Sequence, residues 1–176
     1  MTRVIRKSKA QSAGDVLDLL NALFTAELIA PSRCLWLVSP WISDVEIIDN
    51  SVGTYPVLAH YGKRVVRLAE VLGTLAMAGT KIVIATTPDL ANSTFIRRMQ
   101  LLRRDLHIEQ VVDIQTDYSG RLHTKALTGD DYALAGSMNI TFNGIFIREE
   151  QVELKTDTEY VAQARMDAYD RFGGVL

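Results

Sequence analysis

Residues of the kinds that form disulfides and metal sites are scarce in this chain of 176 residues. Its one cysteine, Cys34, excludes an intrachain disulfide and fits a reducing compartment. The three histidines show no zinc-type spacing with it, so we expect neither a metal nor another cofactor. Cys34 opens the apolar run CLWLV, which predicts a buried thiol.

Long hydrophobic runs and a large excess of charge are also missing. No stretch reaches the roughly 20 apolar residues of a membrane helix, and TRVIRKSKAQ after Met1 is not a signal peptide. We therefore expect a soluble, cytoplasmic protein without membrane association. The net charge of −2 excludes a uniformly basic nucleic-acid-binding domain. The composition is that of an ordinary globular protein, and we expect one domain over residues 1–176 with a flexible basic N-terminus at 1–12.

Stretches with helical and strand patterns alternate along the chain. Helices are predicted over 14–29, 65–79, 89–106 and 157–172. Strands are predicted over 34–40, 81–87, 107–115, 121–128, 131–136 and 148–156, and 44–63 is read as a loop-rich insertion. This order predicts an α/β sandwich with a mixed, mostly parallel β-sheet flanked by helices. Ligands of such folds bind beyond the carboxyl ends of strands.

The most informative run of the sequence is LHTKALTGDDYALAGSMNITFNG. It places His123, Lys125 and Asp130 in the spacing H-x-K-x4-D, and G-S-x-N follows after a short gap. On a strand over 121–128, His123 and Lys125 would project from one face and Thr124 from the other.

These residue types suit the chemistry of phosphate esters. A neutral imidazole such as that of His123 is a competent nucleophile near pH 7. The Lys125 ammonium would attract the non-bridging oxygens of a phosphate. Gly136 lets the backbone approach a ligand closely, and the Ser137 hydroxyl and the Asn139 amide can donate hydrogen bonds to it. No metal is needed for this set.

The run resembles the signature of the phospholipase D-like superfamily, and NITFNG resembles its small, single-motif bacterial nuclease-like branch. A weaker similarity is to the phospholipase D-like proteins of deazaguanine DNA-modification clusters. The resemblance implies a metal-independent phosphodiesterase, a nuclease that hydrolyses DNA through a phosphohistidine. By resemblance, His123 is nucleophile or acid/base, Lys125 and Asn139 bind the phosphate, and Ser137 is a further donor.

Two acidic residues take roles by the same resemblance. Asp130 matches the motif aspartate, with an orienting role, and Glu153 sits where relatives place a glutamate that hydrogen-bonds the active-site histidine. Only five residues, Asp131 to Ala135, separate Asp130 from G-S, where the family usually has six. Asp131 is therefore the nearby alternative to Asp130.

The mechanism implied by the resemblance needs two histidines, and this chain has one H-x-K. His60 and His107 lack a lysine two residues on. The site is therefore expected to be shared by a homodimer with a two-fold axis. Phe142, Ile145 and Phe146 are candidates for the interface, with ordinary core as the alternative.

A few residues outside the motif are candidates for substrate binding. Arg97 and Arg98, in a basic cluster on a predicted helix, suit a phosphate backbone, and the alternative is a solvated helix face. Trp41 is predicted to be a pocket wall that can stack on a base.

Two other functions stay open at this stage. One is a catalytically silent DNA-binding or assembly subunit, working with other proteins of a DNA-modification or restriction system. The other is a phospholipid phosphodiesterase, which the lack of a membrane anchor and of a basic amphipathic helix disfavours.

Overall fold

The computed structural model describes residues 1–7 and 13–176. Its strands are β1 (Thr2–Lys7), β2 (Cys34–Val38), β3 (Glu46–Asp49), β4 (Val65–Arg67), β5 (Lys81–Thr86), β6 (Val112–Thr116), β7 (Ala126–Thr128), β8 (Ala133–Gly136) and β9 (Glu150–Lys155). Its α-helices are α1 (Ala13–Ile29), α2 (Leu68–Met77), α3 (Ser93–Asp105) and α4 (Thr158–Phe172). Short helical turns are η1 (Pro56–Tyr61), η2 (Leu90–Asn92) and the π-helical η3 (Asn143–Ile147).

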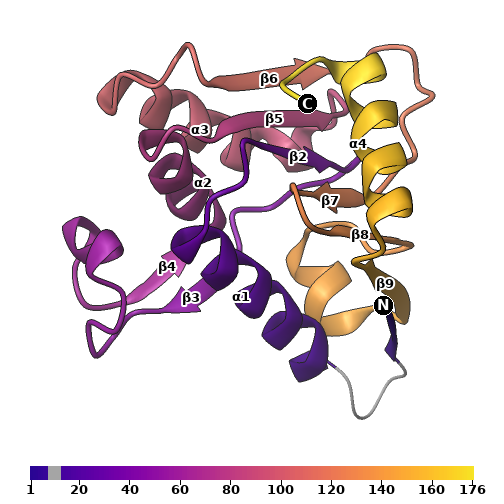
Figure 1. The fold of residues 1–176 in the computed structure, drawn as a ribbon. Helices are drawn as coiled ribbons and strands as arrows, with labels where there is room; N and C mark the ends of the chain where they lie inside the picture. Colours follow the sequence, from indigo (N-terminus) through magenta and orange to yellow (C-terminus); the bar gives the residue numbers. More distant parts are fainter. Residues whose placement is uncertain (8–12) are drawn as a thin grey trace.

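Seven strands form one sheet in the order β1-β9-β8-β7-β2-β5-β6 (Figure 1). The predicted class, a mixed sheet flanked by helices, is confirmed. Within this described sheet, β2–β5 and β5–β6 pair in parallel and the other four pairings are antiparallel, although the sequence predicts a mostly parallel sheet. The difference arises because β7 and β8 form a hairpin, and β9 and β1 extend the sheet from its edge in the same antiparallel manner.

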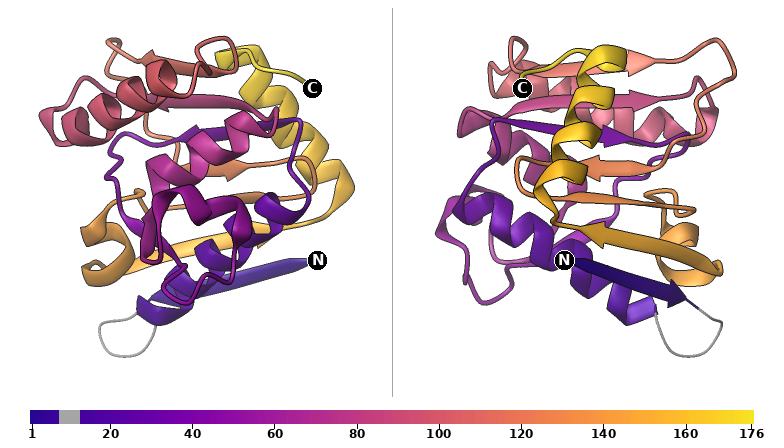
Figure 2. Two further views of the ribbon diagram at one scale, coloured as in Figure 1. Left: turned by 90° about the vertical axis from the view of Figure 1, so that its left-hand side faces the viewer. Right: turned by 45° about the vertical axis from the view of Figure 1, so that its right-hand side comes forward.

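Helices cover both faces of this sheet. Figure 2 shows α4 lying across the strands on one face, with α1, α2 and α3 on the other. Side chains alternate accordingly along β2: Cys34 and Trp36 face α4, whereas Leu35 and Leu37 enter the larger core. Burial on both faces explains why CLWLV is apolar throughout, and the predicted burial of Cys34 is confirmed.

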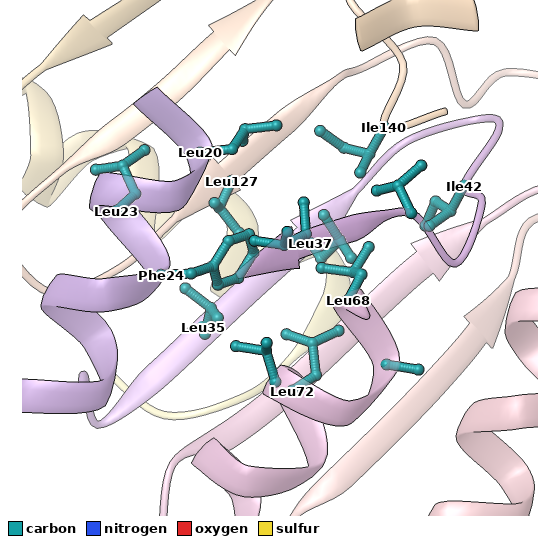
Figure 3. Close-up of a cluster of buried hydrophobic side chains, with 14 of the residues drawn as sticks. Leu20, Leu23, Phe24, Leu35, Leu37, Ile42, Leu68, Leu72, Leu127 and Ile140 are labelled. Atoms are coloured by element: carbon teal, nitrogen blue, oxygen red, sulfur yellow. The ribbon is translucent and has the colours of Figure 1, made fainter. Parts of the chain in front are cut away.

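The larger core joins α1 and α2 to the middle of the sheet. Figure 3 shows Phe24 of α1 and Leu72 of α2 near Leu37 of β2. Ile42 and Ile140, from two loops, reach the same cluster and form a parallel bridge. This bridge links the loop after β2 to the segment after β8, and both contribute to the candidate site. No helix in the described parts of the chain is long and apolar enough to cross a membrane.

The prediction of a flexible N-terminus is wrong for residues 2–7, because they form β1 at the edge of the sheet. Thr2 to Lys7 pair antiparallel with β9, and Lys7 lies opposite Glu150. Apolar Val4 and Ile5 among basic residues suit an edge strand. Residues 8–12 lie outside the described part of the chain.

The segment read as a loop-rich insertion also contains regular structure. β3 and β4 form a separate two-stranded sheet, so α2 begins at Leu68 rather than at the predicted residue 65. β-branched Val65 and Val66 favour the strand. Glu70, in the first turn of α2, is 2% exposed and accepts hydrogen bonds from the Arg67 backbone N–H, Arg64 and Arg98.

Replacing Glu70 by glutamine is expected to lower the free energy of unfolding by about 2–3 kcal/mol, because a buried acceptor of charged hydrogen bonds is lost. Those bonds hold the pKa of Glu70 below 4.5, despite burial, which raises it. The folded-state pKa is depressed, so the stabilisation is present above pH 4.5 and is lost as pH falls toward the folded-state pKa.

Urea unfolding of E70Q and the wild type between pH 3 and pH 7 measures this difference. E46Q is the matched control, because Glu46 is 57% exposed and pairs with Arg67 at the surface. Its effect is expected to stay below about 1 kcal/mol. Equal losses in both variants would contradict a special role for Glu70.

Candidate active site

The residues of the motif gather at one edge of the seven-stranded sheet, called the site edge here. The parallel strands β2 and β5 end there, at Val38 and Thr86. Since β7 is antiparallel to β2 and Ala126 lies opposite Val38, the segment before β7 arrives at the same edge. β8 and β1 also end there, and β9 begins there. This is the carboxyl edge of the parallel strands, where α/β folds bind ligands.

The predicted strand over 121–128 is mostly wrong, because only Ala126–Thr128 joins the sheet. His123 and Lys125 lie in the preceding extended segment. They still meet, because Lys125 Nζ donates to the His123 carbonyl at 2.8 Å and lies 3.5 Å from His123 Nδ1. His123 is exposed and Lys125 is 9% exposed, so the imidazole projects from the surface above a buried cation.

The loop before His123 is ordered by Asp117. Its carboxylate accepts hydrogen bonds from the Ser119 hydroxyl and backbone and from the Leu122 backbone. The Ser119 bonds are the main cause that lowers the pKa of Asp117. Leu122, 4% exposed, packs in the core under α4 and fixes the neighbouring His123 at the site edge.

Gly136 and Ser137 lie between Lys125 and β9. The Gly136 N–H donates to the Lys125 carbonyl at 3.3 Å, and the Ser137 N–H donates to the Gln151 carbonyl at 2.9 Å. A Cβ on Gly136 would lie 2.0 Å from the Gln151 oxygen, so no larger residue fits. The Ser137 hydroxyl donates to Glu150 and accepts from the Gln151 N–H.

Asn139 is 6% exposed and lies beside the loop that follows β2. Its Oδ1 is 3.1 Å from the Ser39 hydroxyl, which is also 2.9 Å from the Trp41 carbonyl. With its oxygen engaged, the Asn139 amide group has its N–H donors available for a phosphoryl oxygen. Gly144 is packed so closely that a Cβ there would lie 2.3 Å from the Asn139 carbonyl.

Lys7 is a second buried cation at the site edge, and sequence reasoning missed it. It is 6% exposed, and its Nζ donates to the carbonyls of Gly144 and Ile145 at 3.1 and 2.7 Å. Burial lowers the pKa values of Lys7 and Lys125, and the charge of Glu150 opposes both shifts. The residues Val4–Lys7 show no apolar–polar alternation, so the sequence carries no signal that Lys7 is buried, although the burial alternates along β1.

Glu150, rather than the predicted Glu153, is the carboxylate of this cluster. It bonds Ser137 and acts electrostatically on both lysines. Glu153 accepts from the Gln151 side chain at 3.0 Å and lies 3.6 Å from Lys155. The Lys155 ammonium lies 4.0 Å from the centre of the Tyr160 ring of α4. Glu153, two residues before Lys155, projects from the same face of β9, toward α4. The structure therefore has no hydrogen bond between Glu153 and His123.

The predicted orienting role of Asp130 is also wrong. Asp130 lies in the turn between β7 and β8, at the other end of β7 from His123. Its carboxylate accepts from the Arg33 backbone at 2.9 Å and forms an ion pair with Arg165 of α4 at 3.0 Å. It therefore joins the hairpin to β2 and α4. The alternative, Asp131, is exposed in the same turn.

A pocket of about 340 Å³ opens beside these groups. Trp41 forms part of its wall, as predicted, and donates from Nε1 to Asp89 at 2.9 Å. Asn139, Phe142 and Glu150 line it too, whereas His123 and Lys125 stand outside its lining.

The candidates for the dimer interface and the arginine candidates for substrate binding lie in different environments. Phe142 is 57% exposed, but Ile145 is fully buried and belongs to the core. Arg97 is exposed on α3, whereas Arg98 pairs with buried Glu70 at 3.0 Å. Within residues 1–7 and 13–176, no three histidine, cysteine or acidic side chains are grouped so as to hold a metal ion.

Comparisons with known proteins find similarity in structure but none in sequence. No family model matches the chain, and no curated protein matches it by sequence. NucT from Helicobacter pylori matches in structure with a TM-score of 0.58 at 14% identity, over 98% of this chain and 96% of NucT. Nuc from Salmonella typhimurium, a phospholipase D family member, matches with a TM-score of 0.62 at 10% identity, over 98% and 93%.

A third structure shows that this fold is also found in larger proteins. The phosphatidylserine synthase of Haemophilus influenzae matches with a TM-score of 0.57 at 12% identity, over 96% of this chain and 36% of the synthase. The chain therefore has the fold of phospholipase D family members. At these identities the likeness shows the fold and leaves the chemistry to be argued from the residues.

Proposed function

We propose that this protein is a metal-independent phosphodiesterase of the phospholipase D type, a nuclease that hydrolyses DNA. One observation carries the proposal: His123, Lys125, Ser137, Asn139 and Glu150 gather at the carboxyl edge of a sheet with the fold of Nuc and NucT. They supply a nucleophile, a cation, neutral donors and a carboxylate, which together suffice for attack on phosphorus.

The reaction proceeds in two displacements. The unprotonated nitrogen of one His123 attacks phosphorus, the bond to the leaving oxygen breaks, and a second histidine gives its proton to that oxygen. That second histidine then takes a proton from water, which attacks the phosphohistidine and breaks the P–N bond. Lys125 and Asn139 stabilise the charge on the non-bridging oxygens in both steps.

Glu150 replaces Glu153 as the proposed orienting carboxylate. A nucleophilic Nε2 requires the proton on Nδ1, and a carboxylate is the acceptor that fixes this tautomer. The Lys125 ammonium, now near Nδ1, cannot accept that proton. A bound substrate phosphate would attract the Lys125 ammonium away from Nδ1. The Nδ1–H of His123 would then donate to the Glu150 carboxylate.

The second histidine is proposed to be the partner's His123 in a homodimer. His60 lies exposed in η1 and His107 follows the C-terminal end of α3, so neither belongs to the site edge. Apolar side chains beside the pocket offer a contact surface, because Phe142 is 57% and Ile147 60% exposed. A two-fold axis at this edge brings two copies of His123 face to face.

The test compares E150Q with E153Q in cleavage of labelled DNA in excess EDTA. The wild type is expected to cut, E150Q to lose about 10²–10⁴-fold in kcat, and E153Q to stay near wild type. The two variants make the same change three residues apart on β9. A change in the pH profile of E150Q alone would distinguish loss of a positioning carboxylate from a folding defect.

Three outcomes would contradict parts of the proposal. EDTA-sensitive cleavage would remove the metal-free mechanism. Hydrolysis of phosphatidylcholine vesicles but not of DNA would favour the phospholipid phosphodiesterase. DNA binding without cleavage would favour a silent subunit of a DNA-modification or restriction system, for which the weaker sequence similarity to proteins of deazaguanine DNA-modification clusters is the support.

A further inference from the structure

A second charged surface lies between the β3–β4 hairpin and helices α2 and α3. It is an open groove of about 540 Å³, called the arginine groove here, lined by Glu46, Arg64, Val65, Arg67, Glu70 and Arg98. The proposed reaction at His123 uses none of these residues.

Buried Glu70 holds two arginines of the groove in fixed positions. Its Oε1 lies 2.7 Å from Arg64 Nη2 and 3.0 Å from Arg98 Nη2. Glu70 is 2% exposed, whereas the side chains of Arg64 and Arg98 are 43% and 42% exposed. The guanidinium groups are therefore oriented by a buried anion and still face solvent, which lowers the entropic cost of binding an anion.

Arg67 connects the groove to the pocket at the site edge. Its Nη1 donates to the Asp44 carbonyl at 2.8 Å, and Asp44 is next in the chain to Ser43, which lines that pocket. Its Nη2 bonds Glu46, whose carboxylate is 57% exposed. Arg67 also precedes the first residue of α2, where the helix dipole favours an anion.

The segment leading into α3 connects the wall of the pocket to the arginine groove. Ala91 lines the pocket, and Arg98 lies seven residues on, about 10 Å at the helical rise per residue. Successive phosphates of one strand of a DNA duplex advance by about 3.4 Å along its axis, so a polynucleotide bound at the pocket reaches the groove within a few nucleotides.

We infer that the arginine groove is a second phosphate-binding subsite for the backbone of a polynucleotide strand, a few nucleotides from the pocket at the site edge. The inference rests on the proposed function and names the substrate class as a polymer. A lipid head group with a single phosphodiester is too short to occupy both sites. Three arginines face two glutamates in the groove, and exposed Glu46 competes with a phosphate for Arg67.

The test measures binding of a labelled single-stranded oligonucleotide by anisotropy over a range of salt, in a catalytically inactive H123A background. R67A is expected to weaken binding about fivefold at low salt and to reduce the slope of log K against log salt by about 0.7. E46Q is expected to strengthen binding by a similar factor, because it frees Arg67. R104A removes an exposed arginine near the far end of α3 and is the matched control.

Failure of the inference and failure of the proposed function give different results. An R67A slope equal to that of R104A, or no gain in E46Q, would overturn the subsite whatever the catalytic result. Bis(p-nitrophenyl) phosphate, which is too small to reach the groove, reports the chemistry alone. In an enzyme that keeps His123, R67A is expected to leave the hydrolysis of this small substrate unchanged. If R67A lowers the hydrolysis of bis(p-nitrophenyl) phosphate as much as it lowers the cleavage of DNA, the subsite is also overturned.

Discussion

Replacing His123 by alanine is expected to abolish EDTA-resistant DNA cleavage, with a loss of at least about 10³-fold in kcat. The reason is that the two lysines which the structure describes at the site edge, Lys7 and Lys125, are buried and donate to carbonyl oxygens, so neither is an alternative nitrogen nucleophile. Stability should be unaffected, because the His123 side chain is exposed. H60A is the control, and it should retain full activity.

Mixing the two proteins tests whether the site is shared. If each site needs two copies of His123, wild type and H123A unfolded together and refolded in equal amounts should retain about one quarter of wild-type activity. Chains that act independently would retain about one half. Activity at the higher value would remove the shared site, and residual cleavage by pure H123A would remove the histidine nucleophile.

Gly136→Ala is expected to lower the free energy of unfolding by about 3 kcal/mol or more and to abolish activity in whatever protein folds. The added Cβ would lie 2.0 Å from the backbone oxygen of Gln151, which cannot turn aside as a side chain can. Separating β8 from β9 would also break the Ser137 N–H bond to that oxygen and displace the Ser137–Glu150 pair.

Gly14→Ala makes the same chemical change at a helical position with open space around it. It is expected to change stability by less than about 1 kcal/mol, toward stabilisation. Thermal unfolding of both variants measures the difference. A G136A protein as stable as G14A would show that the sheet accommodates a methyl group there.

The sequence was sufficient for the layers of the fold and for the grouping of the motif residues, because apolar alternation and the H-x-K…G-S-x-N spacing are local signals. It was insufficient where a role depends on which strand lies opposite. Glu150 and Glu153 share one strand, and only the pairing with β1 and β8 shows which carboxylate meets the lysines. The sequence predicts Arg98 to be a cation on the protein surface, whereas in the structure it forms an ion pair with buried Glu70 of α2.

Lys7 illustrates the same limit at the N-terminus. Its basic neighbours predict a solvated tail, yet β9, almost at the other end of the chain, offers an edge to which β1 adds. Long-range strand pairing of this kind leaves no local trace in a sequence.

The pairing of β1 with β9 also bears on how the protein is made. Lys7 reaches the carbonyls of Gly144 and Ile145 across 137 and 138 positions of the chain. Strand β9 leaves the ribosome long after β1, so the groups around Glu150 cannot assemble on a nascent chain that does not yet contain β9. The proposed catalytic cluster therefore forms only after both of these strands have been synthesised.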